Sequence, residues 1–147
     1  MRAVVTRVSS ASVAIDGQTV GEIGTGFLVL LGIGPEDTAA QAEKLADKIC
    51  GLRVFADEAG KMNRNLEAVG GALLVVSQFT LYADIKSRRP GFTKAAPPAV
   101  AIPLYERFLD LCREKGFRVA HGTFGADMAV SSVNDGPVTI WMDTDTM

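Results

Sequence analysis

The sequence predicts an α+β fold: a single β-rich domain over residues 1–147, with two main helices packed on antiparallel or mixed sheets in a barrel-like arrangement. Three observations favour this fold. Seven or more segments carry strand patterns, only two carry a helical pattern, and the two types do not alternate along the chain. A doubly wound fold would require that alternation. The length suits one domain with a sizeable core.

The first third of the chain is predicted to be β structure. Apolar residues alternate or run together over 3–8 and 12–15, and Asp16-Gly17 is a strong hairpin signal. Residues 18–23 then form the returning arm. After a glycine-rich turn, the continuous apolar run Phe27–Leu31 is typical of a central strand.

Residues 38–50 carry the clearest helical pattern. Thr38 and Gln41 have the spacing of a capping box, and Gly51 stands where a C-terminal glycine is expected. A second helix is predicted over about 99–115. Pro103 is awkward inside it, so this helix either starts just before the proline or bends there.

The remaining predicted strands are short. They cover residues 52–55, 72–81, 117–120, 128–133 and 138–142. Residues 143–147 are expected to form a loose tail.

Composition and charge indicate an ordinary globular protein of the cytoplasm. Hydrophobic residues make up 48% of the chain and charged residues 22%, which excludes a disordered chain. No apolar stretch approaches the ~20 residues of a membrane span, and no signal-peptide pattern opens the chain. The net charge of −2 argues against a protein that coats long stretches of nucleic acid.

Metal, nucleotide and triad chemistry find little support. The two cysteines, Cys50 and Cys112, lie in helical apolar patterns and are expected to be buried small hydrophobes. His121 is the single histidine and has no paired spacing with the cysteines, so no metal site and no cofactor are expected. We expect no catalytic role for His121.

Two polar insertions interrupt otherwise apolar strands. Ser77-Gln78-Phe79-Thr80-Leu81 follows an apolar run, and buried Ser, Gln and Thr side chains would each need hydrogen-bond partners. Asn134-Asp135-Gly136-Pro137-Val138-Thr139 places Gly and Pro together before another strand, where Pro removes a ladder donor. Taken singly, each has a structural explanation: polar pairing within a sheet, and a tight turn between the last two strands.

Together, in this order and at this separation, the two motifs resemble those of the D-aminoacyl-tRNA deacylase family. Further segments extend the resemblance over nearly the whole chain: Arg2–Val8, Gly60–Asn63, Arg89–Phe92 and Pro137–Trp141. The resemblance implies a cofactor-free hydrolase that releases D-amino acids from aminoacylated tRNA. It implies catalytic residues at Ser77, Gln78, Phe79 and Thr80.

The resemblance also implies a homodimer whose active site is completed across the interface. A Gly136-cis-Pro137 pair of one subunit would enter the site of its partner, where its carbonyls face the substrate's amino group and exclude an L side chain. Glycine has no side chain to be excluded, so glycyl-tRNA is a second expected substrate. Arg7 would hold the element in place, and Asn134 is assigned with these residues to substrate binding.

Two mechanisms follow for the ester hydrolysis. In the preferred one, the Phe79 and Thr80 N–H groups bind the ester carbonyl and the ribose hydroxyl of the terminal adenosine assists the attack of water. In the second, Thr80 is a covalent nucleophile, although no base stands near it in the sequence.

Two alternatives to a deacylase are a non-catalytic binding module for tRNA ends or free D-amino acids, and a hydrolase of other small esters or amides that uses Thr80. A basic segment favours a tRNA substrate over a free small molecule. Its cations are Lys86, Arg88, Arg89 and Lys94. A solvated charged loop and an RNA-facing patch are equally good interpretations of that segment.

Overall fold

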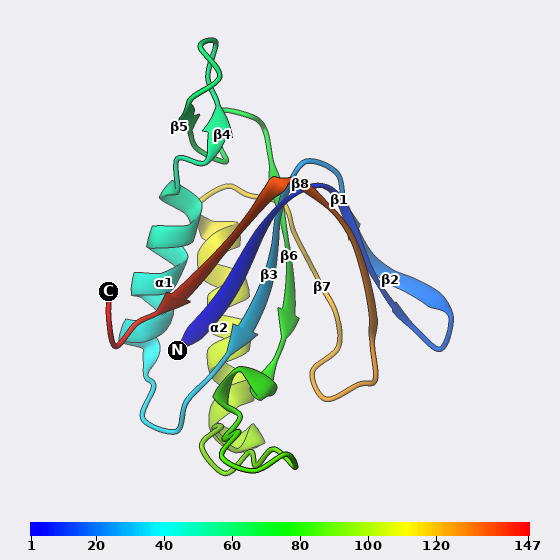
Figure 1. Cartoon of the computed structure of the whole chain (residues 1–147), viewed down its shortest axis with the longest axis vertical. Coiled ribbons are helices and arrows are strands. Elements are labelled where there is room, and N and C mark those ends of the chain that lie inside the picture. Colours follow the sequence, from blue (N-terminus) through cyan, green and yellow to red (C-terminus); the bar gives the residue numbers. More distant parts are fainter.

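The computed structural model describes residues 1–147, which fold around one mixed six-stranded sheet (Figure 1). Its strands are β1 (Arg2–Ile15), β2 (Gln18–Ile23), β3 (Gly26–Gly32), β6 (Ala72–Ser77), β7 (Val119–His121) and β8 (Ala129–Asp143). A separate hairpin of β4 (Phe55–Ala56) and β5 (Met62–Arg64) projects at one end. The helices are α1 (Ala39–Gly51), α2 (Pro98–Glu114) and the short 3₁₀ helix η1 (Phe79–Tyr82).

The long strand β1 organises the sheet because it pairs with three other strands. Its first half pairs with β3 and its second half with β2, both antiparallel. β8 runs antiparallel to β1 along nearly its whole length. β3 pairs in parallel with β6, and β6 in parallel with β7, which makes the sheet mixed.

The two ends of the strand order, β2 and β7, approach each other and nearly close the sheet into a barrel. Gly21 permits the approach, because a Cβ at this position would lie 2.8 Å from the carbonyl oxygen of His121. The Arg118 guanidinium donates a hydrogen bond of 3.1 Å to the carbonyl oxygen of Glu22 across the gap. The predicted barrel-like α+β fold is confirmed.

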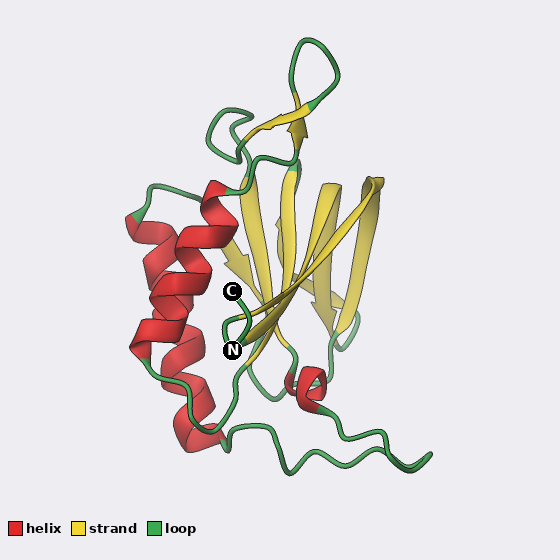
Figure 2. Cartoon of the chain, turned by 60° about the vertical axis from the view of Figure 1, so that its left-hand side comes forward, coloured by secondary structure: helices red, strands yellow, loops and turns green.

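Two hydrophobic cores lie on the two faces of the curved sheet. The larger, with 24 buried residues, lies between the sheet and the pair α1 and α2, which cover one face (Figure 2). The smaller, with 8 buried residues, fills the barrel. β1 contributes to both: Val5 faces the helices, whereas Val8 and Val13 face the barrel interior. A register shift at Ser9, between residues 8 and 10, separates these two patterns and bends the strand.

Both helices were predicted, with differences at their ends. The capping box of α1 forms: the Thr38 side chain accepts from Ala40 N–H, and Gln41 Oε1 accepts from Thr38 N–H at 2.7 Å. The expectation for Gly51 was wrong, because the glycine is the last helical residue and Leu52 follows as the C-cap. Helix α2 begins at Pro98 and includes Pro103. Neither helix has the length and apolar character needed to cross a membrane.

Three predicted strand boundaries were wrong. The strand predicted over 72–81 stops at Ser77, and the chain turns into η1. The strand predicted over 52–55 is reduced to β4, Phe55–Ala56. The strands predicted over 128–133 and 138–142 are one strand, β8, because β1 is long enough to pair with residues on both sides of the Gly-Pro segment.

The predicted loose tail was also wrong. Asp143 and Thr144 are buried, and Asp143 forms an ion pair of 3.0 Å with Arg2. Thr144 Oγ1 accepts a hydrogen bond of 2.8 Å from the Met1 amino group, and Lys44 donates one of 2.9 Å to the Met147 carbonyl. These contacts hold the C-terminal residues against β1 and α1.

Candidate active site

The Ser77–Thr80 segment forms a sharp turn at the C-terminal end of β6. Gln78 N–H still donates to Leu31 O at 2.8 Å, but the Gln78 backbone (φ −142°, ψ 78°) then leaves the strand and η1 begins. The N–H groups of Phe79 and Thr80 lie in the first turn of η1, where a helix leaves its donors without intrahelical acceptors. Both residues are exposed. The turn therefore combines two backbone donors with a hydroxyl group at the protein surface.

Two small cavities flank this turn. The first, of about 50 Å³, is lined mainly by apolar side chains from β3, α2 and the segment around Phe124. The second, of about 200 Å³, extends toward Met128 and Val130 at the start of β8. Ser77, Gln78, Phe79 and Gly125 line both cavities. The turn is thus the wall between them.

The Thr80 hydroxyl has no base beside it. Its side-chain hydrogen bond is with the Gln78 amide, which donates through Nε2 to Thr80 Oγ1. His121 lies on β7, contacts the carbonyl oxygen of Gly122 through Nδ1 at 2.6 Å, and lines a different groove along α2. This geometry offers no means of activating Thr80 as a nucleophile.

The second motif is a four-residue bulge in β8. Asn134 pairs with Val8 and Thr139 pairs with Thr6, so residues 135–138 lie opposite Arg7 alone. Asn134 closes the base of the bulge: its Nδ2 donates to Thr139 Oγ1 at 2.9 Å, and its Oδ1 accepts from Val138 N–H at 2.9 Å. At the tip, Gly136 and Pro137 are exposed and joined by a cis peptide bond.

Arg7 supports this bulge from β1. Its Nε donates a hydrogen bond of 2.9 Å to the carbonyl oxygen of Asp135 and forms an ion pair of 3.7 Å with the Asp135 carboxylate. Its Nη1 donates to Val54 O at 2.6 Å. The Arg7 side chain is only 13% exposed, so it is held in place between β1 and the bulge and is not a freely solvated cation.

One chain does not bring the two motifs together. Arg7 pairs with Phe27 and Phe27 with Leu73, at the start of β6, whereas Ser77 lies at the opposite end of β6 beside Leu31. Four residues of strand correspond to about 13 Å along the sheet. The strands between β8 and β6 add a lateral separation of about 14 Å. Gly136 and Pro137 therefore line neither cavity of the Ser77–Thr80 turn.

Arg2 is a residue near the site to which sequence reasoning gave no role. Its Nη1 donates to Leu81 O in η1 at 2.9 Å, and its guanidinium lies 4.3 Å from the centroid of the Tyr82 ring. β1 therefore braces η1 through Arg2 and the Gly-Pro bulge through Arg7. Its position at the start of an apolar strand is the only signal in the sequence for this role.

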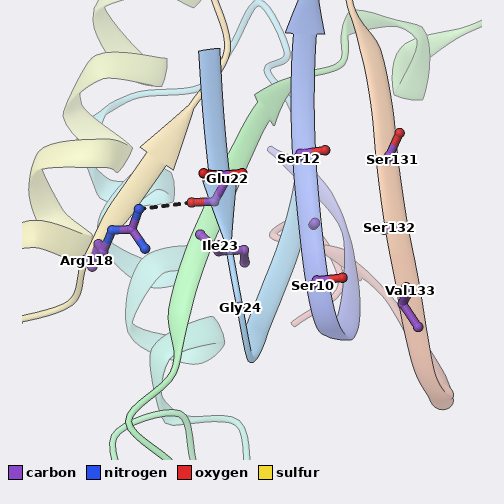
Figure 3. A pocket seen from close by; sticks show the side chains of 10 residues that line it. Ser10, Ser12, Glu22, Ile23, Gly24, Arg118, Ser131, Ser132 and Val133 are labelled. Carbon is purple, nitrogen blue, oxygen red and sulfur yellow. Dashed lines mark hydrogen bonds between the residues drawn. The ribbon is translucent and has the colours of Figure 1, made fainter. Parts of the chain in front are cut away.

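A wide groove of about 550 Å³ crosses the C-terminal half of β1 between β2 and β8 (Figure 3). Hydroxyl side chains dominate its floor, with Ser10 and Ser12 on β1 and Ser131 on β8. Arg118, bonded to the Glu22 carbonyl, stands at one side. The groove contains none of the candidate catalytic residues, and it shares Val133 with the exposed surface of β8.

Known proteins of one family resemble this chain along nearly its whole length. The family model described as D-Tyr-tRNA(Tyr) deacylase matches residues 4–143. A D-aminoacyl-tRNA deacylase of Symbiobacterium thermophilum is 55% identical over 146 residues, covering 99% of this chain and 97% of that protein. One from Shewanella baltica is 59% identical over 140 residues, with 95% and 97% covered.

Solved structures share the fold. One named c-Myc DNA Unwinding Element Binding Protein has a TM-score of 0.91 and 44% identity, covering 97% of this chain and 98% of that one. A probable eukaryotic D-amino acid tRNA deacylase has a TM-score of 0.85 at 17% identity, with 96% and 97% covered, which shows the likeness of fold.

The fold and these relatives define a hydrolase that acts on the ester bond of aminoacyl-tRNA. The chain belongs to the D-Tyr-tRNA(Tyr) deacylase family, whose curated relatives are D-aminoacyl-tRNA deacylases.

Proposed function

We propose that this deacylase works as a homodimer in which each active site joins the Ser77–Thr80 turn of one subunit to the Gly136-Pro137 tip of the other. The observation that carries the proposal is the separation of the two motifs in one chain. The Gly136-Pro137 tip is rigidly supported but lines no cavity of the Ser77–Thr80 turn in its own chain. A second copy of the chain would bring its turn to this tip. A twofold pair then contains two equivalent sites.

The exposed surface of β8 supports this assembly. β8 pairs only with β1, so its other edge offers unpaired backbone groups. Val130, Val133 and Trp141 are 39%, 57% and 54% exposed. Apolar side chains exposed along an edge strand mark a protein contact surface. The adjoining hydroxyl-lined groove would be filled by the same partner.

In the proposed mechanism, the Phe79 and Thr80 N–H groups bind the carbonyl oxygen of the aminoacyl ester. As water adds to the carbonyl carbon, the neighbouring ribose hydroxyl of the substrate accepts a proton from the water and donates its own to the ester's ribose oxygen. The two N–H groups stabilise the resulting oxyanion, which re-forms the carbonyl as the bond between the carbonyl carbon and the protonated ribose oxygen breaks. The products are free D-amino acid and tRNA. The lack of a base near Thr80 favours this route over a covalent Thr80 ester.

Chirality would be read by exclusion. The carbonyl groups of the Gly136-Pro137 tip would face the substrate's amino group and leave space for hydrogen where an L residue carries its side chain. This is chiral proofreading of translation. Glycine has no side chain to exclude, so glycyl-tRNA, including glycine mischarged on the alanine tRNA, would also be hydrolysed. We place this activity in the cytoplasm, and we assign no metal or cofactor to it.

The first test measures amino acid release from one tRNA charged in turn with D-tyrosine, L-tyrosine and glycine, in the presence of a chelator. We expect loss of the D-tyrosyl and glycyl esters, with the L-tyrosyl ester intact. Equal loss of both enantiomers would contradict exclusion by the Gly-Pro tip. Activity that disappears with the chelator would contradict a metal-free mechanism.

A subunit-mixing experiment tests the composite site. Subunits altered at the turn (Thr80→Pro, which removes one of the two N–H groups) and subunits altered at the tip (Gly136→Ala) are expected to be inactive or unselective alone. In a mixed dimer, one site would combine both alterations and the other would be entirely wild type. Recovery of D-selective hydrolysis on mixing is expected, and its absence, with mixed dimers shown by mass spectrometry, would contradict the cross-subunit site.

A further inference from the structure

The loop Asp84–Lys94, which leads away from the Ser77–Thr80 turn, has a charge opposite to that of the rest of the protein. It carries four cations, Lys86, Arg88, Arg89 and Lys94, and one carboxylate, Asp84. The whole chain has a net charge of −2, so the remaining residues together carry −5. A local positive region on an acidic protein attracts a polyanion to one place on its surface.

The loop is held in shape by its own hydrogen bonds. Asp84 and Gly91 exchange backbone hydrogen bonds of 2.8 and 2.9 Å, which close the loop at its base. The Asp84 side chain accepts from Lys86 N–H at 3.0 Å, and Ser87 Oγ donates to Arg89 O at 2.7 Å. The cations therefore project from an ordered loop, which extends from the body of the protein (Figure 2).

Three of the four cations are free of partners in the chain. Lys94 forms an ion pair of 3.7 Å with Asp84. The side chains of Lys86, Arg88 and Arg89 form neither a hydrogen bond nor an ion pair with other residues of the chain, and all three residues are exposed. Their charge is thus available to an external ligand.

An exposed aromatic pair joins the loop to the active site. The rings of Phe79 and Phe92 meet edge to face, with centroids 5.0 Å apart, and are 54% and 37% exposed. Phe79 lines both cavities of the turn, so Phe92 stands at their outer margin. Exposed aromatic rings beside arginine and lysine form the usual binding platform for single-stranded nucleic acid, where rings stack on bases and cations contact phosphates.

We propose that the Asp84–Lys94 loop and the Phe92 ring bind the single-stranded acceptor end of tRNA on its path to the active site. Lys86, Arg88 and Arg89 contact its phosphates, and Phe92 stacks on a base that precedes the esterified nucleotide. The inference rests on the proposed function, because it places this surface beside the Ser77–Thr80 turn. It makes the loop a determinant of affinity for tRNA rather than of chemistry.

The test compares two substrates that differ in what precedes the ester. One is D-tyrosyl-tRNA and the other is D-tyrosyl-adenosine, which has no phosphates. The triple variant K86A/R88A/R89A is expected to lose at least about tenfold in kcat/KM on the tRNA substrate, through KM, and to hydrolyse the adenosine ester like wild type. The slope of log kcat/KM against log salt concentration should fall by about 2 for the tRNA substrate alone.

A control removes three cations from the opposite end of the protein, at the C-terminal ends of α1 and α2 and in the β4–β5 hairpin, in K48A/K61A/R113A (Figure 1). Arg113 differs from the others in forming an exposed ion pair with Asp110. The control should behave like wild type on both substrates. An equal loss in the control, or an equal loss of the triple variant on both substrates, would overturn the proposal. Wild-type kinetics of the triple variant on the tRNA substrate would also overturn the proposal.

Binding of uncharged tRNA, measured without any turnover, separates this inference from the proposed function. The triple variant should bind at least about tenfold more weakly than wild type and control, even if the ester chemistry were different. For Phe92, Phe92→Leu should weaken binding of a single-stranded RNA that ends in the acceptor sequence, whereas Phe92→Tyr should preserve it. Equal affinity of both variants and wild type would exclude stacking on Phe92.

Discussion

Arg7 and Gly136 are matched in space: a Cβ at Gly136 would lie 2.9 Å from Arg7 Nη2, while Arg7 Nε holds the adjacent Asp135 carbonyl at 2.9 Å. The guanidinium occupies the space that a side chain at position 136 would need. Because β1 is paired on both sides, Arg7 projects from a rigid strand. The position of the Gly-Pro tip is therefore fixed by the sheet and not by a flexible loop.

Replacing Arg7 should reduce the stereoselectivity of hydrolysis more than its rate on D-tyrosyl-tRNA. Arg7→Met removes the hydrogen bonds to Asp135 O and Val54 O, at a cost of about 1–3 kcal/mol in the free energy of unfolding. With the tip loosened, we expect the ratio of D- to L-tyrosyl-tRNA hydrolysis to fall at least about tenfold, equivalent to ~1.4 kcal/mol of discrimination. Lys44→Met is the control, because Lys44 also donates to two backbone carbonyls, those of Thr144 and Met147, but lies on α1 and does not contact the tip. An unchanged ratio in Arg7→Met would contradict this role.

Gly136→Ala should impair the enzyme through crowding. Besides Arg7 Nη2, the new Cβ would meet Val138 Cγ2 at 2.8 Å. Gly60→Ala isolates this effect, because Gly60 also has a positive φ (+78°) but its Cβ would meet nothing within 4 Å. Both variants should lose about 1–2 kcal/mol of stability from backbone conformation. Only Gly136→Ala should alter D-tyrosyl-tRNA hydrolysis or its stereoselectivity. The same kinetics in both variants would show that crowding at the tip is unimportant.

Thr80 should contribute little as a nucleophile. Thr80→Val is expected to reduce kcat on D-tyrosyl-tRNA by less than about a hundredfold, whereas loss of a covalent nucleophile typically costs about 10⁶-fold. Thr80→Ser serves as the hydroxyl-bearing control. A tRNA ending in 2′-deoxyadenosine should lose about 10²–10⁴-fold, the range for a proton-transfer group. A trapped ester on Thr80 in rapid-quench mass spectrometry would reverse this assignment.

Asp143 should make the free energy of unfolding depend on pH in the acidic range. Burial raises the pKa of Asp143, but the hydrogen bond from Asp145 N–H and the pair with Arg2 outweigh it, so the pKa lies below its ordinary value. Its stabilisation is therefore present above about pH 4, the unfolded value, and is lost as pH falls through the folded pKa. Asp143→Asn should lower the free energy of unfolding in urea at pH 7 and flatten its decline below pH 4. Asp110→Asn, at an exposed ion pair, should change neither.

Local signals in the sequence predicted the elements that local chemistry determines. Asp16-Gly17 forms the hairpin turn with positive φ values of 51° and 79°, and Thr38 with Gln41 forms the capping box. The prediction that Gly51 lies just beyond the C-terminus of α1 was wrong, because Gly51 is the last helical residue. The two polar motifs were recognisable because each places residues where strand stability does not require them.

Pairing between distant segments could not be predicted in the same way. β8 continues past Gly136-Pro137 because β1 supplies partners on both sides of the bulge, and nothing near residue 136 indicates the length of β1. The turn at Gln78 and the anchoring of residues 143–147 also depend on contacts with remote residues, chiefly Leu31 and Arg2. The support that Arg2 gives to η1 likewise depends on a residue 79 positions away, Leu81, whose carbonyl accepts its hydrogen bond.

Arg2 and Arg7 set the distance between two contacts made by β1. Arg2 donates a hydrogen bond to Leu81 O in η1, and Arg7 donates one to Asp135 O before the Gly-Pro tip. The two arginines are five residues apart on one strand. At about 3.3 Å per residue, that interval places the two contacts about 17 Å apart along β1. An insertion or deletion between Arg2 and Arg7 would therefore shift the contact that supports η1 relative to the contact that supports the Gly-Pro bulge.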